Sequence, residues 1–408
     1  MSLPPVSVIV VSRGRAESLK RTVAAIGQSD HPALELVVVA DADGIAALGG
    51  TICKRVQFDR PGIAEARNLG LLQAAGAVVA FIDDDAVPEP TWASRLAAAL
   101  GDPAVVLATG WTRGRNGISF QWKAMEVDAN GFDHPLPDGP GLYRCPPGRA
   151  VKPIGTNCAF RRATLLAAGG FDPAYRFYLE DADVGLRLAQ HGLAAVVPAA
   201  QVHHGFAPSE RRDAARRPLS LRDIGASAMV FLRRHAPEPD WPSALARLRA
   251  EQSARVRHLT DRAALLQGLE AGIAEAAARD LPELTPLADA PPPFLPLPGT
   301  GPRPGLVIAG RPWQRARLRA DATNAAAQGQ IVTLIRLTPT LLRHRHSFNP
   351  SGFWEQWGGT LGRSDRAAGF RLVGFSTRLA QEMRRLSAVR PVNWAGNGEK
   401  PQQFPPFR

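Results

Sequence analysis

Residues 77–85 read AVVAFIDDD, and this stretch decides how the first half of the chain is interpreted. Its six apolar residues are typical of a strand that is buried on both faces of a parallel sheet. The aspartates follow directly, and in an open α/β sheet the ligand crevice lies outside the carboxyl ends of the strands. Carboxylates there can hold Mg²⁺ or Mn²⁺ against a substrate's phosphates. Taken alone, the same acids also fit a solvated turn that caps a helix starting near Thr91.

Strand-like and helix-like segments alternate around this stretch. The predicted strands are residues 6–11, 34–40, 51–58 and 104–110, and the predicted helices are residues 17–27, 63–75 and 92–100. This alternation favours βαβ units. The predicted fold class is therefore α/β, with a mostly parallel sheet flanked by helices.

The length of 408 residues indicates two domains, or one large domain with an appendage. Composition shifts divide the chain into an α/β domain at residues 1–235, a helical extension at 236–280, a proline-rich linker at 281–304 and a basic module at 305–408. Residues 111–151 break into Gly, Pro and isolated aromatics, which predicts a long irregular loop or an insertion. In the basic module we expect a helix at 315–327 and a strand at 330–337.

The net charge of +12 resides in the last quarter of the chain. Residues 301–408 contain 16 Arg and one Lys against five acidic residues. A basic module can meet anionic lipid headgroups, a polyanionic glycan, nucleic acid or an acidic subunit, and an arginine-rich surface without a partner fits equally well. Because no nucleic-acid motif with interleaved aromatics occurs there, nucleic acid is not expected, whereas peripheral contact with an anionic membrane stays open.

Three features bear on the cellular compartment. The cysteines Cys53, Cys145 and Cys158 are scattered and odd in number, which gives neither a disulfide framework nor a zinc spacing and fits a reducing cytoplasm. The start of the chain has no basic region followed by an apolar one, so no secretion signal is expected. No apolar run approaches the roughly 20 residues of a membrane span. The expected location is the cytoplasm, at most peripheral at the inner face of a membrane.

A second acidic site follows the predicted strand 34–40. Asp41 would lie beside Asp83 if the two strands are near neighbours in a parallel sheet. A carboxylate in that place can accept the N3–H of a uracil or thymine ring. The alternative is that Asp41-Ala42-Asp43-Gly44 is simply a turn.

A third acidic site precedes the amphipathic run at residues 184–191. Glu180, Asp181 and Asp183 all stand at its beginning, where one carboxylate would suffice to cap a helix. A carboxylate at a helix N-terminus is also kept ionised near neutral pH, which suits a general base.

The order of these motifs resembles the nucleotide-sugar-dependent glycosyltransferases of family 2, which have the GT-A fold. The matching segments, in the family's order, are residues 6–12 followed by Arg15, 35–41, 62–70, 81–85, 155–162, 169–172, 180–188 and 202–204. Each segment alone is weakly specific, whereas all of them in order across the first half of the chain are strongly specific. The resemblance implies that Asp83 and Asp85 are the outer members of a D-x-D motif.

The resemblance also implies roles for individual side chains. Asp181 would be the catalytic base, supported by Glu180. The nucleotide would be bound by Ser12, Arg15, Asp41, Arg67, Asp83 and Asp84, with Asp41 and Arg67 at the nucleobase and nearby phosphate and Asp83 at the ribose. Asp85 would hold a divalent metal, Mn²⁺ or Mg²⁺, and His203 is favoured over His204 as the histidine that approaches the metal or the diphosphate.

Two features point to the acceptor. Asn157 lies where the family places a loop between donor and acceptor. The aromatic residues Trp111, Trp122 and Tyr143 fall in the segment 111–151 and form a candidate platform, because aromatic faces stack on sugars. The alternative is that these aromatics belong to the core.

The implied activity is that of a non-processive, metal-dependent, inverting glycosyltransferase of cell-envelope polysaccharide biosynthesis. It would move a sugar from a nucleoside-diphosphate sugar, with UDP favoured, to a hydroxyl group of a glycan or lipid-linked acceptor. The lack of a Gln-x-x-Arg-Trp motif argues against processive synthesis, and Ala40 replaces a second acid that the family commonly has. The alternatives are a nucleotidyltransferase, whose basic glycine-containing loop is only faintly echoed by residues 12–15, and a non-catalytic nucleotide- or glycan-binding scaffold.

Overall fold

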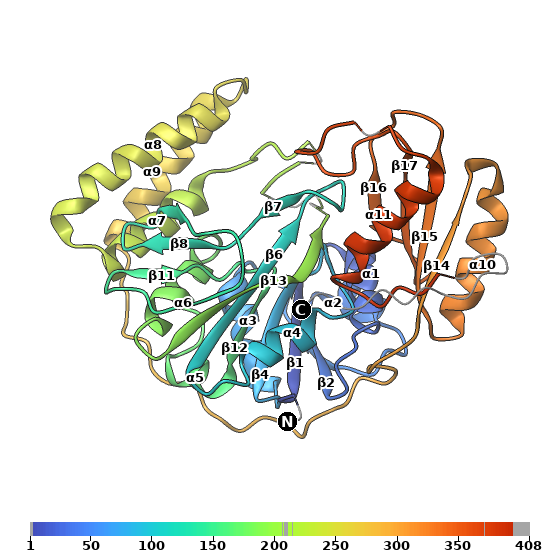
Figure 1. Cartoon of the computed structure of the whole chain (residues 1–408). Helices are drawn as coiled ribbons and strands as arrows, with labels where there is room; N and C mark the ends of the chain where they lie inside the picture. The colour runs from blue at the N-terminus through green and yellow to red at the C-terminus, as the bar shows by residue number, and fades with distance from the viewer. Residues whose placement is uncertain (1–2, 206, 208–210, 214, 371, 395–408) are drawn as a thin grey trace.

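A ten-stranded sheet forms the centre of the computed structural model, which describes residues 3–205, 207, 211–213, 215–370 and 372–394 (Figure 1). The strand order is β10-β13-β6-β12-β4-β1-β2-β3, with β5 attached to β13 and β7 attached to β6. The strands are β1 (Val6–Ser12), β2 (Leu34–Ala40), β3 (Lys54–Gln57), β4 (Val78–Asp83), β5 (Ala86–Pro88), β6 (Val105–Arg113), β7 (Phe120–Trp122), β10 (Gly141–Tyr143), β12 (Cys158–Arg161) and β13 (Leu193–His204). Neighbours from β3 to β4 are parallel, as are β6 and β13, and β12 runs antiparallel between β4 and β6. The predicted α/β class with a mostly parallel sheet is confirmed.

Helices cover both faces of this sheet. They are α1 (Ala16–Ile26), α2 (Ala42–Ala47), α3 (Ile63–Gln73), α4 (Trp92–Ala99), α5 (Arg162–Ala167) and α6 (Glu180–Leu188). Because side chains alternate along a strand, Val8 and Val10 of β1 share one apolar core with α1 and α4, whereas Ile9 shares another with α3, α5 and α6. The helices predicted at residues 17–27, 63–75 and 92–100 are confirmed to within two residues at each end.

Residues 111–151 contain more regular structure than the sequence suggests. Besides β7 and β10, they form β8 (Met125–Asp128), β9 (Asp133–Pro135) and β11 (Arg149–Val151), which pair as a separate sheet in the order β11-β8-β9. Strands of three or four residues offer too few alternating positions to be recognised in a sequence. Their pairing with neighbouring strands decides their structure.

Three helices follow the central sheet: α7 (Arg222–His235), α8 (Trp241–Val256) and α9 (Arg262–Ala278). Helices α7 and α9 approach closely because each presents a glycine to the other. A Cβ atom on Gly225 would lie 2.2 Å from the carbonyl oxygen of Leu269, and one on Gly272 would lie 2.0 Å from that of Arg222. Among the described residues, no helix combines the length and the apolar character needed to span a bilayer.

The proline-rich residues 281–304 run along the outside of the sheet towards the last part of the chain (Figure 1). They are attached to β2, because the amide of Leu297 donates to the carbonyl of Leu34 at 2.8 Å. The amide of Leu295 donates to the carboxylate of Glu35 at 2.9 Å. This segment is therefore fastened to the start of β2 along part of its length.

The last part of the chain forms its own four-stranded sheet, and we use "C-terminal module" for residues 305–394. The elements are β14 (Gly305–Gly310), α10 (Arg315–Ala327), β15 (Ile331–Thr338), β16 (Arg345–Phe348), β17 (Trp354–Gly359) and α11 (Phe375–Ser387). The strand order is β14-β15-β17-β16, with only β16 antiparallel. The predicted helix at 315–327 and strand at 330–337 are confirmed.

The C-terminal module packs against the first half of the chain. Phe348 and Trp354 share a buried apolar cluster with Ala25 of α1 and Val87 of β5. The amide of His346 donates to the carbonyl of Asn116 at 2.8 Å. The module is therefore joined both to the edge of the central sheet and to the segment that follows β6.

The buried imidazole of His346 makes this module sensitive to acid. Burial, followed by the charges of Arg390, His203 and Arg385, lowers the pKa of His346 well below its ordinary value of 6.5, and the contact with Gln356 opposes this only weakly. The unfolded chain takes up a proton here near pH 6.5 and the folded chain does not. We expect this group to leave stability unchanged above that pH and to lower it by up to about 1.4 kcal/mol per pH unit below it.

Thermal unfolding between pH 7.5 and pH 5 would measure this effect. A His346→Asn variant should lose less stability over that range than the natural chain, by about one proton's contribution. The matched control is His258→Asn, because His258 is exposed after α8. Equal acid dependence of the natural chain and the His346→Asn variant would contradict the assignment.

Candidate active site

The carboxyl ends of β2, β1 and β4 meet at one edge of the sheet. In the parallel register Ser12 lies beside Ala40, and Val11 lies beside Asp83. Asp41 therefore follows the strand on one side of β1, and Asp83 ends the strand on the other side. The two acids share an edge as expected, with β1 between them.

Asp83, Asp85 and His204 form a group whose ligand atoms all lie within 4.8 Å of one another. Asp83 ends β4 and Asp85 lies in the turn that follows it. Strand β5 then pairs with β13 in a register that sets His204 beside Ala86. Among the residues that the structure describes, no other set of three acids, histidines or cysteines meets this spacing. Two carboxylates and one imidazole can hold a divalent cation.

Asp85 is buried and surrounded by donors. Its carboxylate lies 3.2 Å from Nε2 of His204, 3.3 Å from Nη1 of Arg15 and 3.6 Å from Nη2 of Arg212, and it accepts the amide of Ala207 at 2.8 Å. Burial opposes its ionisation, but the contact with His204 and the charge of Arg15 outweigh it, so the pKa of Asp85 is lowered to about 2. Asp85 therefore carries a full negative charge at neutral pH.

His203 does not occupy the position that the sequence favoured for it. Its Nε2 lies 2.7 Å from Oε1 of Glu89, and burial lowers its pKa to about 4. Adjacent residues of a strand point to opposite faces, so His203 and His204 cannot both face Asp85. The expectation is corrected: His204 is the histidine beside the candidate metal site.

The side chain of Asp84 is enclosed by the protein. Its side chain is 0% exposed, accepts the hydroxyl of Ser12 at 2.6 Å and lies 2.7 Å from Nη2 of Arg15. Burial raises its pKa to about 7, with Arg15 and Ser12 opposing the rise. The expected contact of Asp84 with the nucleotide is therefore replaced by an internal one. Asp84 fixes Ser12 and Arg15, both of which line the cavity described below.

Asp41 holds two loops together at its end of β2. One carboxylate oxygen caps α2 by accepting the amide of Gly44 at 2.8 Å, and the other accepts the amide of Gly14 at 2.5 Å. Gly14 lines the cavity. Asp41 is half-buried and lies at the rim, next to the loop that connects β1 with α1.

Arg67 connects the D-x-D turn with the first turn of α6. It is 3% exposed, and its guanidinium lies 3.6 Å from Asp83 and 2.9 Å from Glu180. It also donates to the carbonyl of Gly155 at 3.1 Å. Arg67 was expected at the nucleobase and phosphate; in the structure it is an enclosed link between two acidic sites.

The three acids at the start of α6 have different partners. Asp183 is buried against Arg187 and His235, and Glu180 is buried against Arg67. Asp181 alone is half-buried, and it accepts the amide of Gly155 at 3.1 Å. It is therefore the acid of this turn that is most open to a substrate.

The chain enters α6 through a strained conformation. Tyr178 and Leu179 both have positive φ angles, 77° and 66°, which non-glycine residues rarely adopt. Burial of Glu180, followed by the charge of Asp181, raises the pKa of Glu180. Strain and crowded carboxylates at one helix start are typical of functional sites.

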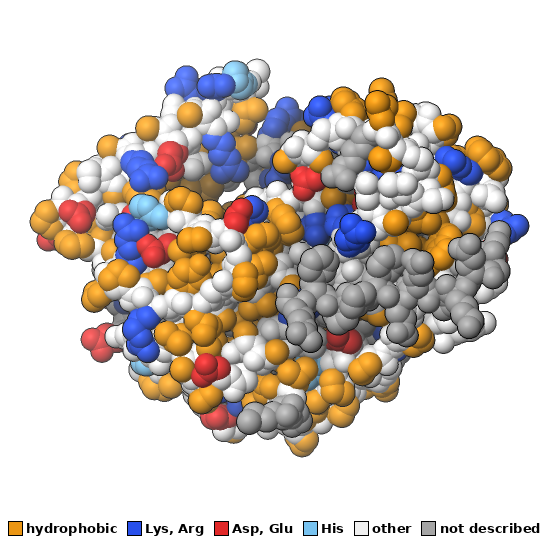
Figure 2. Space-filling model, viewed as in Figure 1, with side chains coloured by type: hydrophobic (Ala, Val, Ile, Leu, Met, Phe, Trp, Pro, Cys, Tyr) orange, Lys and Arg blue, Asp and Glu red, His pale blue; other side chains and the backbone are white. Residues whose placement is uncertain are grey.

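A cavity of about 520 Å³ opens beside these groups. Besides Asp83 and Asp85, its lining contains six arginines from four parts of the chain: Arg13, Arg15, Arg60, Arg211, Arg212 and Arg255. Figure 2 shows Lys and Arg side chains around the hollow between the α8–α9 hairpin and the C-terminal module. The lining predicts an anionic ligand, and Arg211, Arg212 and Arg255 were not among the residues singled out from the sequence.

Two of the predicted acceptor residues, Asn157 and Trp111, contact other parts of the protein interior, whereas Trp122 lies next to the candidate metal site. Asn157 is 0% exposed and donates to the carbonyls of Trp111 and Ala200, while accepting the indole N–H of Trp92 at 2.7 Å. It is thus a structural residue, and the expected acceptor contact is corrected. Trp111 packs edge-on against Phe120.

Trp122 is the aromatic residue that reaches the candidate metal site. Its ring centroid lies 5.3 Å from that of His204. It belongs to β7, which pairs with the carboxyl-terminal part of β6. The indole of Trp122 therefore borders the candidate metal site.

Comparison with known proteins gives one family. A model of the family described as glycosyl transferase family 2 matches residues 7–166. The chain is 29% identical over 186 residues to the glucosyl-dolichyl phosphate glucuronosyltransferase of Haloferax volcanii, covering 41% of this chain and 56% of that protein. It is 29% identical over 240 residues to the O-antigen biosynthesis protein RfbC of Myxococcus xanthus, covering 52% of this chain and 18% of that protein. The chain spans less than two thirds of the length of either relative.

Solved structures give more distant likenesses. The mannosyltransferase PcManGT from Pyrobaculum calidifontis, in complex with GDP-Man and Mn²⁺, is 21% identical with a TM-score of 0.41, covering 69% of this chain and 77% of that one. GalNAc-T7 with UDP, GalNAc and Mn²⁺ is 18% identical with a TM-score of 0.43, covering 57% and 48%. The fold of this chain is established by its own strand order. The family match runs from β1 to α5 and includes the turn of Asp83, Asp84 and Asp85, so this part of the chain is similar to glycosyl transferase family 2.

Proposed function

We propose that this chain is a metal-dependent, inverting glycosyltransferase that uses a nucleoside-diphosphate sugar. The observation that carries the proposal is the group of Asp83, Asp85 and His204, two of whose members, Asp83 and Asp85, line an arginine-rich cavity. Arg67 links this group to the turn that presents Asp181. A site for a charged leaving group and a candidate base thus belong to one connected structure.

The donor side fits a diphosphate. The cavity volume of about 520 Å³ is within the usual range for small-molecule sites, and the arginines complement phosphate charge. Asp83, Asp85 and His204 would hold the divalent cation, Mn²⁺ or Mg²⁺, which carboxylates suit. A bound cation would stabilise the negative charge that develops on the departing nucleoside diphosphate. Asp41, at the rim beside Gly14, would accept the N3–H of a uracil base, which favours UDP.

The acceptor side needs one base. As the acceptor oxygen bonds to the anomeric carbon, its proton passes to the carboxylate of Asp181 and the bond from that carbon to the diphosphate oxygen breaks. Attack from the face opposite the leaving group inverts the configuration. Glu180 would help to orient Asp181, because the ion pair with Arg67 fixes the first turn of α6.

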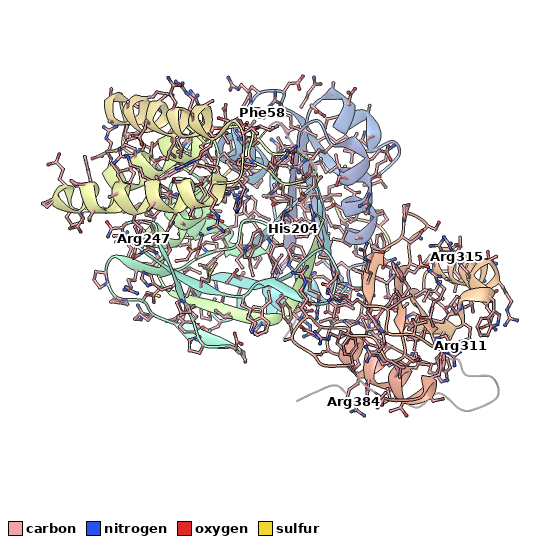
Figure 3. All side chains as sticks on the ribbon, turned by 90° about the horizontal axis from the view of Figure 1, so that it is seen from above. Phe58, His204, Arg247, Arg311, Arg315 and Arg384 are labelled. Atoms are coloured by element: carbon pink, nitrogen blue, oxygen red, sulfur yellow. The ribbon has the colours of Figure 1, made fainter. Side chains whose placement is uncertain are left out.

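The acceptor is proposed to be a glycan or a lipid-linked sugar. The Haloferax relative is named after glucosyl-dolichyl phosphate, a lipid-linked glucose, and the Myxococcus relative is named as a protein of O-antigen biosynthesis. Trp122 would stack on a sugar ring. Action at the cytoplasmic face of a membrane fits such an acceptor, and Figure 3 shows Arg311, Arg315 and Arg384 of the C-terminal module on the side turned away from His204, where an anionic surface could meet them.

A screen of nucleotides and nucleotide sugars by thermal shift tests the proposal. UDP or a UDP-sugar should raise Tm by a few degrees when Mn²⁺ is present, because a ligand at about 100 times its Kd stabilises the folded state by about 2.7 kcal/mol. With EDTA the nucleotide should leave Tm unchanged, because the proposed binding needs the metal. The ligand that shifts Tm should then serve as a donor, with release of the nucleoside diphosphate. A nucleoside triphosphate that shifts Tm and releases pyrophosphate would instead support a nucleotidyltransferase. The absence of a shift with every nucleotide tested would contradict both activities.

A further inference from the structure

A buried ion pair joins the C-terminal module to the central sheet. Glu89 directly follows β5, and Arg390 lies three residues after α11. The guanidinium of Arg390 donates to both carboxylate oxygens of Glu89, at 2.9 and 2.7 Å, and the two side chains are 0% and 1% exposed. A bidentate pair fixes orientation as well as distance. The position of Glu89 is therefore tied to that of the module.

Arg390 is itself fixed by the module. Its guanidinium carbon lies 3.7 Å from the ring centroid of Trp354, and Nη1 donates to the hydroxyl of Thr333 at 3.3 Å. Trp354 and Thr333 belong to β17 and β15. Arg390 is thus held by the sheet of the C-terminal module, and its ion pair ties the position of Glu89 to that sheet.

Glu89 in turn holds His203. Its Oε1 lies 2.7 Å from Nε2 of His203. The module encloses the same imidazole, with ring centroids of His346 and Trp354 at 5.4 and 4.9 Å. His203 is therefore held by a residue of the central sheet and by two residues of the module.

The strand pair β5–β13 connects this contact to the candidate metal site. At one end of the ladder the amide of Glu89 donates to the carbonyl of Gln201 at 2.9 Å, and at the other end the amide of Gly205 donates to that of Asp85 at 2.7 Å. His204 lies in this ladder next to His203. A shift at the Glu89 end of so short a ladder displaces Asp85 and His204 as well.

Stability alone does not explain the ion pair. The module also docks through the apolar cluster of Ala25, Val87, Phe348 and Trp354. Replacing a buried ion pair by apolar residues is often neutral or stabilising, whereas removing one partner is costly. The ion pair fixes one position of the C-terminal module's sheet relative to the central sheet. An apolar cluster alone allows the two sheets to shift against each other.

We propose that Glu89 and Arg390 are positioning residues, through which the C-terminal module sets the geometry of Asp85 and His204. The inference rests on the proposed metal-dependent function, because it assigns these two side chains to a cation. It gives the module a role inside the site, separate from any contact with a membrane.

Manganese affinity of the full chain provides the test, with Arg390→Met compared against Arg336→Met. Arg336 is the matched control, because its ion pair, at 2.6 Å, is with Glu355 inside the module. Both variants should lower Tm. We expect Arg390→Met to weaken Mn²⁺ binding by roughly tenfold or more, as for groups that orient metal ligands, and Arg336→Met to leave it within about twofold of the natural chain.

Hydrogen exchange of the metal-free chain gives an independent readout. Peptides covering residues 83–92 and 198–205 should exchange faster in Arg390→Met than in Arg336→Met. If Arg390→Met does not fold, the double variant Glu89→Gln/Arg390→Met removes both charges and should recover stability. It should still bind Mn²⁺ about tenfold more weakly, because the fixed bidentate contact is lost.

Three results would overturn parts of this argument in different ways. Unchanged Mn²⁺ affinity in the folded Arg390→Met chain or in the double variant would overturn the positioning role. An equal loss of affinity in Arg336→Met would show that Mn²⁺ binding follows overall stability and would also overturn it. A natural chain that binds no Mn²⁺, or an Asp85→Ala variant that binds it equally well, would remove the proposed metal site itself.

Discussion

An Asp181→Asn variant is expected to lose about 10²- to 10⁴-fold in kcat while binding the nucleotide as tightly as the natural chain. The amide keeps the size of the side chain and can still accept the amide of Gly155, but it cannot take up the acceptor proton. Asp181 is not among the residues that line the arginine-lined cavity. Single-turnover transfer rates, combined with Kd for the nucleotide in the presence of Mn²⁺, measure the two quantities separately.

The comparison variant is Glu180→Gln, one residue away. Glu180 is buried against Arg67, so its neutralisation should lower Tm and reduce kcat less than the change at Asp181. If Glu180→Gln abolishes turnover while Asp181→Asn retains it within about tenfold, the base is Glu180, and the assignment to Asp181 fails.

An Asp85→Ala variant is expected to lose the Mn²⁺-dependent rise in Tm that a nucleotide produces, together with all transfer activity. The substitution removes a buried acid of the site, whose pKa is lowered to about 2. Without it a cation keeps only Asp83 and His204 as protein ligands. Calorimetric titration with Mn²⁺ and a thermal-shift assay with the nucleotide measure the loss.

The control for this variant is Asp43→Ala, because Asp43 is an exposed acid in α2, close to the same sheet edge. It should bind Mn²⁺ and nucleotide as the natural chain does. A nucleotide-induced shift that survives in Asp85→Ala, or that never needed a metal, would remove Asp85 from the metal role.

The fold of the first half was predictable because its strands are apolar runs. Strands β1, β2 and β4 are buried on both faces and have few polar interruptions. In the C-terminal module, β16 and β17 were not predicted, because His346 and Gln356 are polar residues at buried positions and disturb the pattern. Helix α11 carried a readable signal, since Leu379, Met383 and Leu386 recur at helical spacing and are all buried.

The candidate site was predictable as a set of acids and less so as a set of contacts. Strand-end position pointed to the three aspartates 83–85, and a surplus of acids at a helix start pointed to Glu180, Asp181 and Asp183. The resemblance to family 2 then singled out Asp83, Asp85 and Asp181. The choice between His203 and His204 depends on which face of β13 is turned towards Asp85. A sequence shows that neighbouring side chains lie on opposite faces of a strand, but it does not show which face meets the site. The enclosed position of Arg67 depends on helix α6, which begins 113 residues later at Glu180.

The Glu89–Arg390 contact also has a consequence for biosynthesis. Its partners are separated by 301 residues, so at about 5 to 20 residues per second the arginine is synthesised some 15 to 60 s after the glutamate. During that interval the carboxylate of Glu89 lacks its bidentate partner. Until the module is made, Val87 of β5 lacks the apolar cover of Phe348 and Trp354. Completion of the site therefore awaits the last residues of the chain, and a truncated product would expose that surface to aggregation.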